Sequence, residues 1–121
     1  MATLTLTKDN FAETIGDNDV VLIDFWAAWC GPCRAFGPVF EAASETHTDV
    51  VFAKVDTEDQ QELAGMFGIT SIPTLVAFRE KVLVFGEPGA LPATELEKVI
   101  SAVQELDMVE VHEKVAAQQK A

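Results

Sequence analysis

Cys30 and Cys33 are the only two cysteines among the 121 residues, and just two residues separate them. A bond between them closes a very small loop and removes little entropy from the unfolded chain, so a purely structural disulfide explains the pair poorly. Two thiols at this spacing can instead alternate between a dithiol and a disulfide by thiol–disulfide exchange. The sequence therefore predicts a redox centre at these two positions.

The flanking segments predict that the pair lies where a buried strand meets a helix. Residues 20–26 are almost continuously apolar, which is typical of a strand buried on both faces. Pro32 suits the first turn of a following helix, because its missing N–H is not needed there. The free N–H groups and the dipole of that turn favour a thiolate at Cys30 and lower its pKa. Cys33, one turn into the helix, is expected to be more buried and to keep a higher pKa.

This asymmetry predicts different roles for the two thiols. We expect Cys30, the more exposed one, to attack a target disulfide, and Cys33 to attack the mixed disulfide and release the reduced target. Gly31 and Pro32 carry no ionisable side chain that would over-stabilise the Cys30 thiolate, which favours a reductant. Two alternatives stay open: an oxidase or isomerase working in the other direction, and a binding module in which the dithiol is not catalytic.

Asp24 is the one acid in the predicted strand at 20–26. A buried acid is costly unless it has a partner or a task. Burial raises its pKa, which suits a proton acceptor for the Cys33 thiol. Lys54 interrupts the apolar strand predicted at 50–55 and is expected to moderate that shift. The alternative is a structural acid bonded to backbone groups or to Lys54.

A zinc site is the alternative to a redox centre at the two cysteines. Zinc takes four ligands, and His47 and His112 are the only histidines beside the two cysteines, at no zinc-finger spacing. We therefore expect no metal and two solvated histidines.

Length and charge limit the class of protein. The chain is 49% hydrophobic and long enough for one core. Its formal net charge of −12 would be repelled by nucleic acid and by anionic membranes, so neither is expected as a partner. No apolar run approaches the roughly 18–20 residues of a membrane span, and no signal peptide is visible at the N-terminus. We expect a cytoplasmic monomer.

Hydrophobic periodicity predicts the elements that position the pair. Strands are expected at residues 3–6, 20–26, 50–55, 74–78 and 82–85, and helices at 8–15 with Thr7 as N-cap, at 31–47, at 58–66 and from about 93. The last two strands are separated by three residues and should pair antiparallel. This order predicts an α/β fold, with a central mixed sheet of about five strands and four helices covering both of its faces.

The stretch Asp-Phe-Trp-Ala-x-Trp-Cys-Gly-Pro-Cys-Arg at 24–34 resembles the active-site sequence of the thioredoxin family, as do Pro38 and residues 53–56, 68–74 and 89–91. The resemblance covers residues 3–105. It predicts a thioredoxin domain at 1–106 and a C-terminal extension at 107–121 that is partly disordered or a short helix. It implies the thioredoxin fold and a protein-disulfide reductase with no bound cofactor, only a redox-active Cys30–Cys33 disulfide. The implied partners are disulfide-containing client proteins and a thioredoxin reductase that uses NADPH.

The resemblance also implies residue roles. By position, Cys30 is the nucleophile, Cys33 the resolving thiol, and Asp24 the buried base assisted by Lys54. A cis peptide bond is implied before Pro73, and it would expose the backbone of the preceding residue for strand-like pairing with a target. The surface that receives the target would consist of Trp29, Gly31, Pro32, Ile72, Pro73 and Gly89.

Three features depart from the family pattern. Arg79-Glu80-Lys81 stands where an Asn-Gly hairpin turn is usual, and Pro88 replaces a β-branched residue next to Gly89. About fifteen residues follow the last helix of the pattern. Because proline has no backbone donor, Pro88 is a position where target preference could differ.

Overall fold

Five strands form one mixed sheet in a computed structural model that describes residues 2–120. The spatial order is β1-β3-β2-β4-β5. β1, β3 and β2 run parallel, whereas β4 is antiparallel to both β2 and β5. The strands are β1 (Thr3–Thr5), β2 (Val20–Trp26), β3 (Val51–Asp56), β4 (Thr74–Arg79) and β5 (Val82–Pro88).

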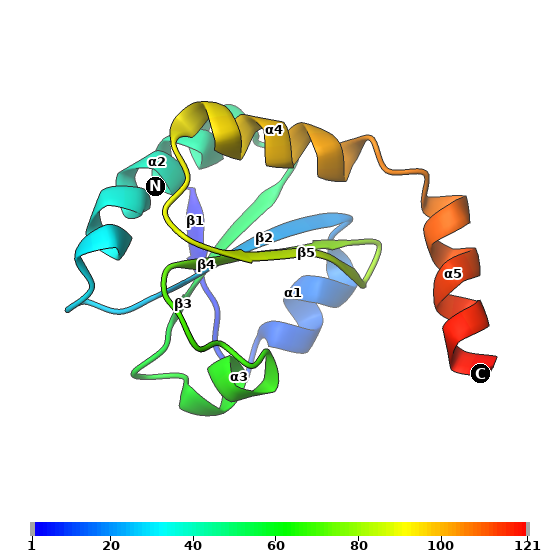
Figure 1. Cartoon of the computed structure of the whole chain (residues 1–121), viewed down its shortest axis with the longest axis horizontal. Coiled ribbons are helices and arrows are strands. Elements are labelled where there is room, and N and C mark those ends of the chain that lie inside the picture. The colour runs from blue at the N-terminus through cyan, green and yellow to red at the C-terminus, as the bar shows by residue number, and fades with distance from the viewer. Residues whose placement is uncertain (1, 121) are drawn as a thin grey trace.

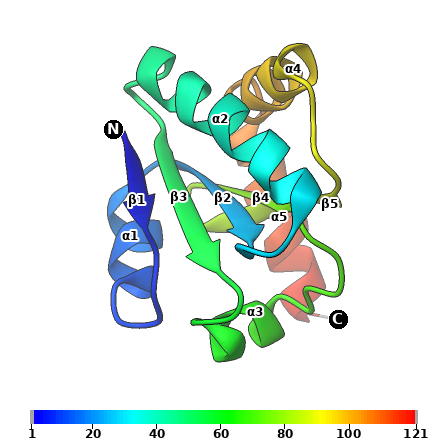
Figure 2. The same cartoon turned by 90° about the vertical axis from the view of Figure 1, so that its left-hand side faces the viewer.

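Four helices cover the two faces of the sheet, as expected. α2 and α4 lie on one face and α1 and α3 on the other (Figure 1), and the turned view shows the same layering (Figure 2). The predicted mixed α/β architecture is therefore confirmed. The helices are α1 (Phe11–Asp17), α2 (Gly31–Thr46), α3 (Gln61–Met66), α4 (Ala93–Gln104) and a fifth, α5 (Met108–Lys120).

Central strand β2 is buried on both faces, as its apolar sequence predicts. Its alternate residues Val20 and Leu22 pack under α2 and α4, where Phe36 and Phe40 meet them. The β2 residues that alternate with these point to the opposite face of the sheet and join the second apolar layer, on the side of α1 and α3. A strand with this burial holds its carboxyl end firmly, and the cysteine pair follows at that end.

The first helix starts later than predicted. Thr7 is not its N-cap, because Asn10 closes a turn ahead of the helix. The Asn10 Oδ1 atom accepts a hydrogen bond from the N–H of Thr7 at 2.8 Å, and its Nδ2 donates to the carbonyl oxygen of Thr5 at 3.0 Å. Helix α1 begins only at Phe11, after this turn.

A two-residue turn, Glu80-Lys81, joins β4 to β5. Both residues have positive φ angles, 50° and 69°. This is the conformation of a type I′ turn, which suits the right-handed twist of the flanking strands and favours Asn-Gly. The hairpin thus keeps the usual geometry, although both of its turn residues carry a Cβ atom that makes a positive φ sterically unfavourable.

Substitution Lys81→Gly is expected to stabilise the protein by about 0.5–1 kcal/mol, because glycine adopts a positive φ without steric penalty. The gain is smaller than the full penalty, since glycine also makes the unfolded chain more flexible. The midpoint of denaturant unfolding measures it. Lys81→Ala is the matched control, because it removes the same charge and keeps the Cβ. An equal gain in both variants would contradict the argument from φ.

Helix α5 follows the domain core and lies beside the β4–β5 hairpin (Figure 1). The Asp107 Oδ1 atom caps it by accepting hydrogen bonds from the N–H groups of Val109 and Glu110. Met108 is buried, and His112 Nε2 lies 2.9 Å from Glu80 Oε1. The expected boundary at residue 106 stays a prediction. Within residues 2–120, none of the helices combines the length and the apolar character needed to cross a membrane.

Candidate active site

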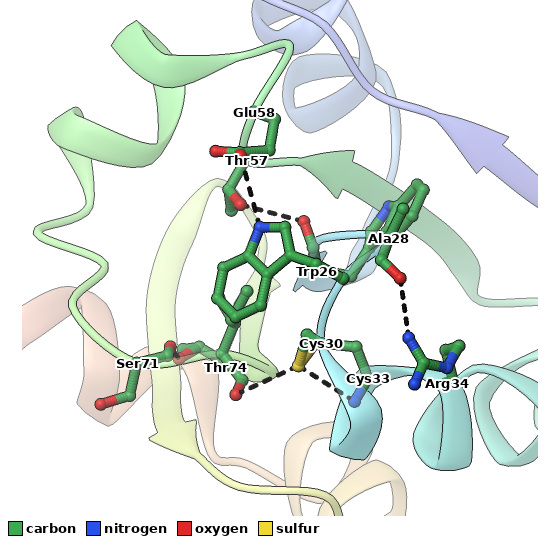
Figure 3. Close-up of a disulfide and its surroundings, with 11 residues drawn as sticks. Trp26, Ala28, Cys30, Cys33, Arg34, Thr57, Glu58, Ser71 and Thr74 are labelled. Carbon is green, nitrogen blue, oxygen red and sulfur yellow. Dashed lines mark hydrogen bonds between the residues drawn. A yellow bond between two sulfur atoms is a disulfide. The ribbon is translucent and has the colours of Figure 1, made fainter.

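The cysteine pair occupies the start of α2. Cys30 is the N-cap residue, and its Sγ accepts a hydrogen bond from the N–H of Cys33 at 3.2 Å. The two residues form a disulfide, with 5.2 Å between their Cα atoms. Figure 3 shows the Cys30 sulfur facing that N–H at the first turn of the helix. A helix start offers unpaired N–H donors and a favourable dipole to a negative sulfur, so this position can stabilise a thiolate.

The two cysteines are equally buried, which corrects the expectation that Cys30 is the more exposed. Each is 4% exposed. The reason is tertiary: Cys30 packs with Ala27 and Cys33 into a small cluster, and Trp26 and Ile72 close over it. The Cys30 Sγ lies 3.7 Å from the Ile72 carbonyl oxygen.

The loop before β4 supplies the other wall of the site. The Ile72–Pro73 peptide bond is cis, as the resemblance implies. The Pro73 side chain is buried, and its carbonyl oxygen accepts a hydrogen bond from the N–H of Gly89 at 2.8 Å. Gly89 has a φ angle of 113°, which side chains rarely tolerate. This bond brings the end of β5 to the loop that faces the disulfide.

Trp29 is the most exposed aromatic residue beside the disulfide. Its side chain is 67% exposed, and its Nε1 donates a hydrogen bond to Glu58 Oε1 at 3.3 Å. Gly31 and Pro32 are exposed in the first turn of α2. The residues predicted to receive a target thus surround the pair. Pro73 differs from the others, because it contributes backbone and not exposed side chain.

Asp24 lies in the middle of β2 and is 0% exposed. It shares the face of Leu22, which packs against α2. Both of its carboxylate oxygens are buried and accept no hydrogen bond from any residue that the structure describes. Burial raises the pKa of Asp24 from 3.8 to about 7, and the positive charge of Lys54 partly offsets this rise. Asp24 is thus not hydrogen-bonded to backbone groups or to Lys54 in the described part of the chain, and its role as a base stays a prediction.

Lys54 is the register partner of Asp24 on the neighbouring strand β3. Its Nζ lies over the indole ring of Trp26, 5.1 Å from the ring centroid. A cation over an aromatic face is attracted by the electrons of the ring. Lys54 therefore acts on Asp24 as a nearby charge and not as a hydrogen-bond donor.

A groove of about 380 Å³ opens between the start of α2 and β3. It reaches the disulfide at Cys33. Its charged lining consists of Arg34, Glu41 and Lys54. Sequence reasoning assigned no role to Glu41. No local pattern in the sequence indicates it, because the groove is formed by residues of α2 together with residues of β2 and β3.

The zinc alternative finds no support in the positions of the histidines. His47 Nε2 lies 2.7 Å from Glu97 Oε1, and His112 contacts the hairpin as described above. Between residues 2 and 120, no group of three or more His, Cys, Asp or Glu side chains could hold a metal ion. The two cysteines are instead bonded to each other.

The fold and site define a class: a thiol–disulfide oxidoreductase with a disulfide at a helix start opposite a cis-proline loop. The model of the family described as Thioredoxin matches residues 2–102. "Putative thioredoxin 2" of Streptomyces coelicolor is 59% identical over 98% of this chain and 88% of the relative. A thioredoxin of Alicyclobacillus acidocaldarius is 45% identical over 84% of this chain and 98% of its own. A solved mutant thioredoxin of Halobacterium salinarum superposes with a TM-score of 0.80 at 37% identity, covering 86% and 92% of the two chains.

The chain belongs to the thioredoxin family. It is a protein-disulfide reductase that carries electrons on the redox-active Cys30–Cys33 disulfide. The family implies client proteins and a thioredoxin reductase as partners.

Proposed function

We propose that this thioredoxin reduces disulfides of client proteins in the cytoplasm and is recycled by an NADPH-dependent thioredoxin reductase. In this proposal Cys30 is the nucleophile, Cys33 the resolving thiol, and Asp24 the proton acceptor whose pKa is moderated by Lys54. The single observation that supports the order of attack is the hydrogen bond from the Cys33 N–H to the Cys30 Sγ. A sulfur at an N-cap is the one that a helix start stabilises as a thiolate.

Reduction proceeds in two exchanges. The Cys30 thiolate attacks one sulfur of the client disulfide, the client S–S bond breaks, and the leaving thiolate takes up a proton. The Cys33 thiol then loses its proton and attacks Cys30 Sγ, which releases the second client thiolate. Two electrons pass to the client, and the Cys30–Cys33 disulfide forms. The reductase restores the dithiol with two electrons from NADPH.

Asp24 suits the proton step because of its pKa. A general base works best when its pKa lies near the working pH, and burial raises the pKa of Asp24 to about 7. An ordinary exposed aspartate, with a pKa near 4, would hold the proton of a thiol far less well. The side chain of Asp24 lies on the face of β2 that packs against α2, the helix that carries Cys33, and this supports its use by that thiol.

The surface around the disulfide supports binding of an extended client segment. We propose that the segment lies against Trp29, Gly31, Pro32 and Gly89 and pairs with the backbone of Ile72. The closeness of the Ile72 carbonyl oxygen to the Cys30 sulfur, 3.7 Å, supports this placement. A client held there presents its own sulfur to Cys30. The buried side chain of Pro73 holds the loop before β4 in its conformation.

The proposal is tested by coupling the full-length protein to a panel of thioredoxin reductases, with insulin as the client. NADPH consumption and insulin precipitation are recorded together. We expect one or more reductases to sustain turnover of NADPH in step with insulin reduction. A redox titration against glutathione serves as the test of direction. A potential on the oxidising side of glutathione, with no NADPH turnover, would contradict a reductase role.

A further inference from the structure

The groove beside Cys33 is lined by the Lys54 ammonium and by the Glu41 carboxylate, and the charge of Lys54 also acts on the buried Asp24. Glu41 lies on α2 in the wall of the groove. Asp24 is buried on β2, where it is the register partner of Lys54, and it does not line the groove itself. Lys54 reaches into the groove next to α2, since a Cβ added at Gly37 would stand 3.9 Å from its Nζ. Because Gly37 and Glu41 are four residues apart, both face the same side of the helix. Lys54 and Glu41 therefore line the same side of the groove, next to α2.

Glu41 is held in place by the edge strand. Its Oε2 atom accepts a hydrogen bond from the Thr3 Oγ1 at 2.9 Å, which ties α2 to β1. Its Oε1 atom is buried and has no hydrogen-bond partner in the described part of the chain. A buried, unpaired carboxylate oxygen is unfavourable unless a positive charge lies nearby. Two cations, Lys54 and Arg34, line the groove, and Lys54 is the one that can provide this charge.

Other charged and titratable groups around Asp24 and Lys54 are already engaged. On α2, Arg34 donates to the carbonyl oxygen of Ala28 at 2.9 Å, and Cys33 is bonded to Cys30. On β3, Asp56 accepts hydrogen bonds from the turn that follows it. The residue opposite Asp24 on β4 is a leucine. Within residues 2–120, two carboxylates thus compete for one ammonium.

We propose that Glu41 is a positioning residue that keeps the Lys54 ammonium over Trp26 and away from Asp24. The inference builds on the proposed base role of Asp24, and it explains how that role is preserved. An ammonium in contact with Asp24 would favour the ionised carboxylate and lower its pKa. Such a carboxylate would be a poor acceptor for the Cys33 proton at neutral pH. Glu41 and the indole of Trp26 both attract the Lys54 ammonium and so keep it away from Asp24.

Substitution Glu41→Gln tests this. The amide keeps the shape of the side chain and an oxygen for Thr3, but it loses the charge. We expect Lys54 to move towards Asp24 and the midpoint of the Asp24 titration to fall by about one to three pH units from its value near 7. The measurement is the carboxyl carbon NMR signal of Asp24 in the oxidised protein, where neither cysteine titrates.

Two further variants separate positioning from charge alone. In a Lys54→Met background, Glu41→Gln should no longer lower the Asp24 midpoint, because no ammonium remains to move. Glu105→Gln, an equal charge change at the exposed end of α4, should leave the midpoint unchanged. Thermal unfolding checks that each variant is folded.

An unchanged midpoint in Glu41→Gln overturns the inference. So does an equal fall in the Lys54→Met background, or an equal fall in Glu105→Gln. These readouts do not depend on turnover. A failed base role would show in reductase assays of Asp24 variants, whereas a failed positioning role shows in the titration.

Discussion

Replacement of Cys30 by Ser is expected to lower the rate of insulin reduction to that of dithiothreitol alone. A serine hydroxyl has almost no anionic form at neutral pH and cannot form a disulfide, so the first exchange has no nucleophile. The hydrogen bond from the Cys33 N–H remains possible, which means that the helix start is preserved while its chemistry is lost. The readout is turbidity as insulin precipitates, with dithiothreitol as the electron donor.

Cys33→Ser is the matched control, because it removes one sulfur of the same pair and leaves the nucleophile. We expect turnover to stop as well, but at a different stage. The Cys30 thiolate still attacks the client, and the mixed disulfide persists without a resolving thiol. Mass spectrometry of the protein after incubation with client should show the covalent adduct with Cys33→Ser and none with Cys30→Ser. Adducts in the reverse pattern would show that the two roles are exchanged.

Asp24→Asn is expected to raise the free energy of unfolding by about 4 kcal/mol at pH 8 and by about 2 kcal/mol at pH 5. The sign follows from the pKa of Asp24, which is about 7 in the folded protein and 3.8 as the ordinary value. Between these values the folded state holds a proton that the unfolded state has lost. The contribution of Asp24 to the stability of the wild-type protein is therefore most favourable below pH 3.8, and this contribution is lost as the pH rises to about 7. Asparagine cannot ionise and avoids that loss.

Denaturant unfolding of the oxidised protein at several pH values measures this effect. Asp9→Asn is the control, since Asp9 is exposed and its substitution should change stability little at any pH. A gain at Asp24 that did not change with pH would argue against burial as the cause.

The Asp24→Asn variant should also slow release of the client from the mixed disulfide, because Cys33 loses its proton acceptor. An unchanged pH–rate profile would contradict the base role.

Local patterns in the sequence were enough to predict the elements and the chemistry of the centre. The apolar run at 20–26 identified the buried central strand, and its one acid, Asp24, stood out because such a strand has no place for a solvated charge. The spacing of Cys30 and Cys33 and the proline between them indicated a dithiol at a helix start. These features depend on neighbours in the chain, which a sequence displays directly.

Helix starts were predicted less well, because side chains from adjoining turns compete with the helix for its first N–H groups. Asn10 delays α1 in this way. Asp56 does the same for α3: its Oδ1 accepts hydrogen bonds from the N–H groups of Glu58 and Asp59, and the helix begins at Gln61 instead of Glu58. Composition indicated a helix start in both places, but not which of several polar side chains would close the turn.

The sequence alone therefore determined the fold class, the redox pair and the buried acid, since periodicity and spacing encode them locally. Only the tertiary structure decided how buried the Cys30 sulfur is, because Ile72, forty-two residues away, closes over it. It also decided that Lys54 lies on an indole and not on Asp24, and that Glu41 faces the same groove. These relations join α2 to β2, to β3 and to the loop before β4. They arise from the packing of distant segments, for which the linear order of residues carries no local signal.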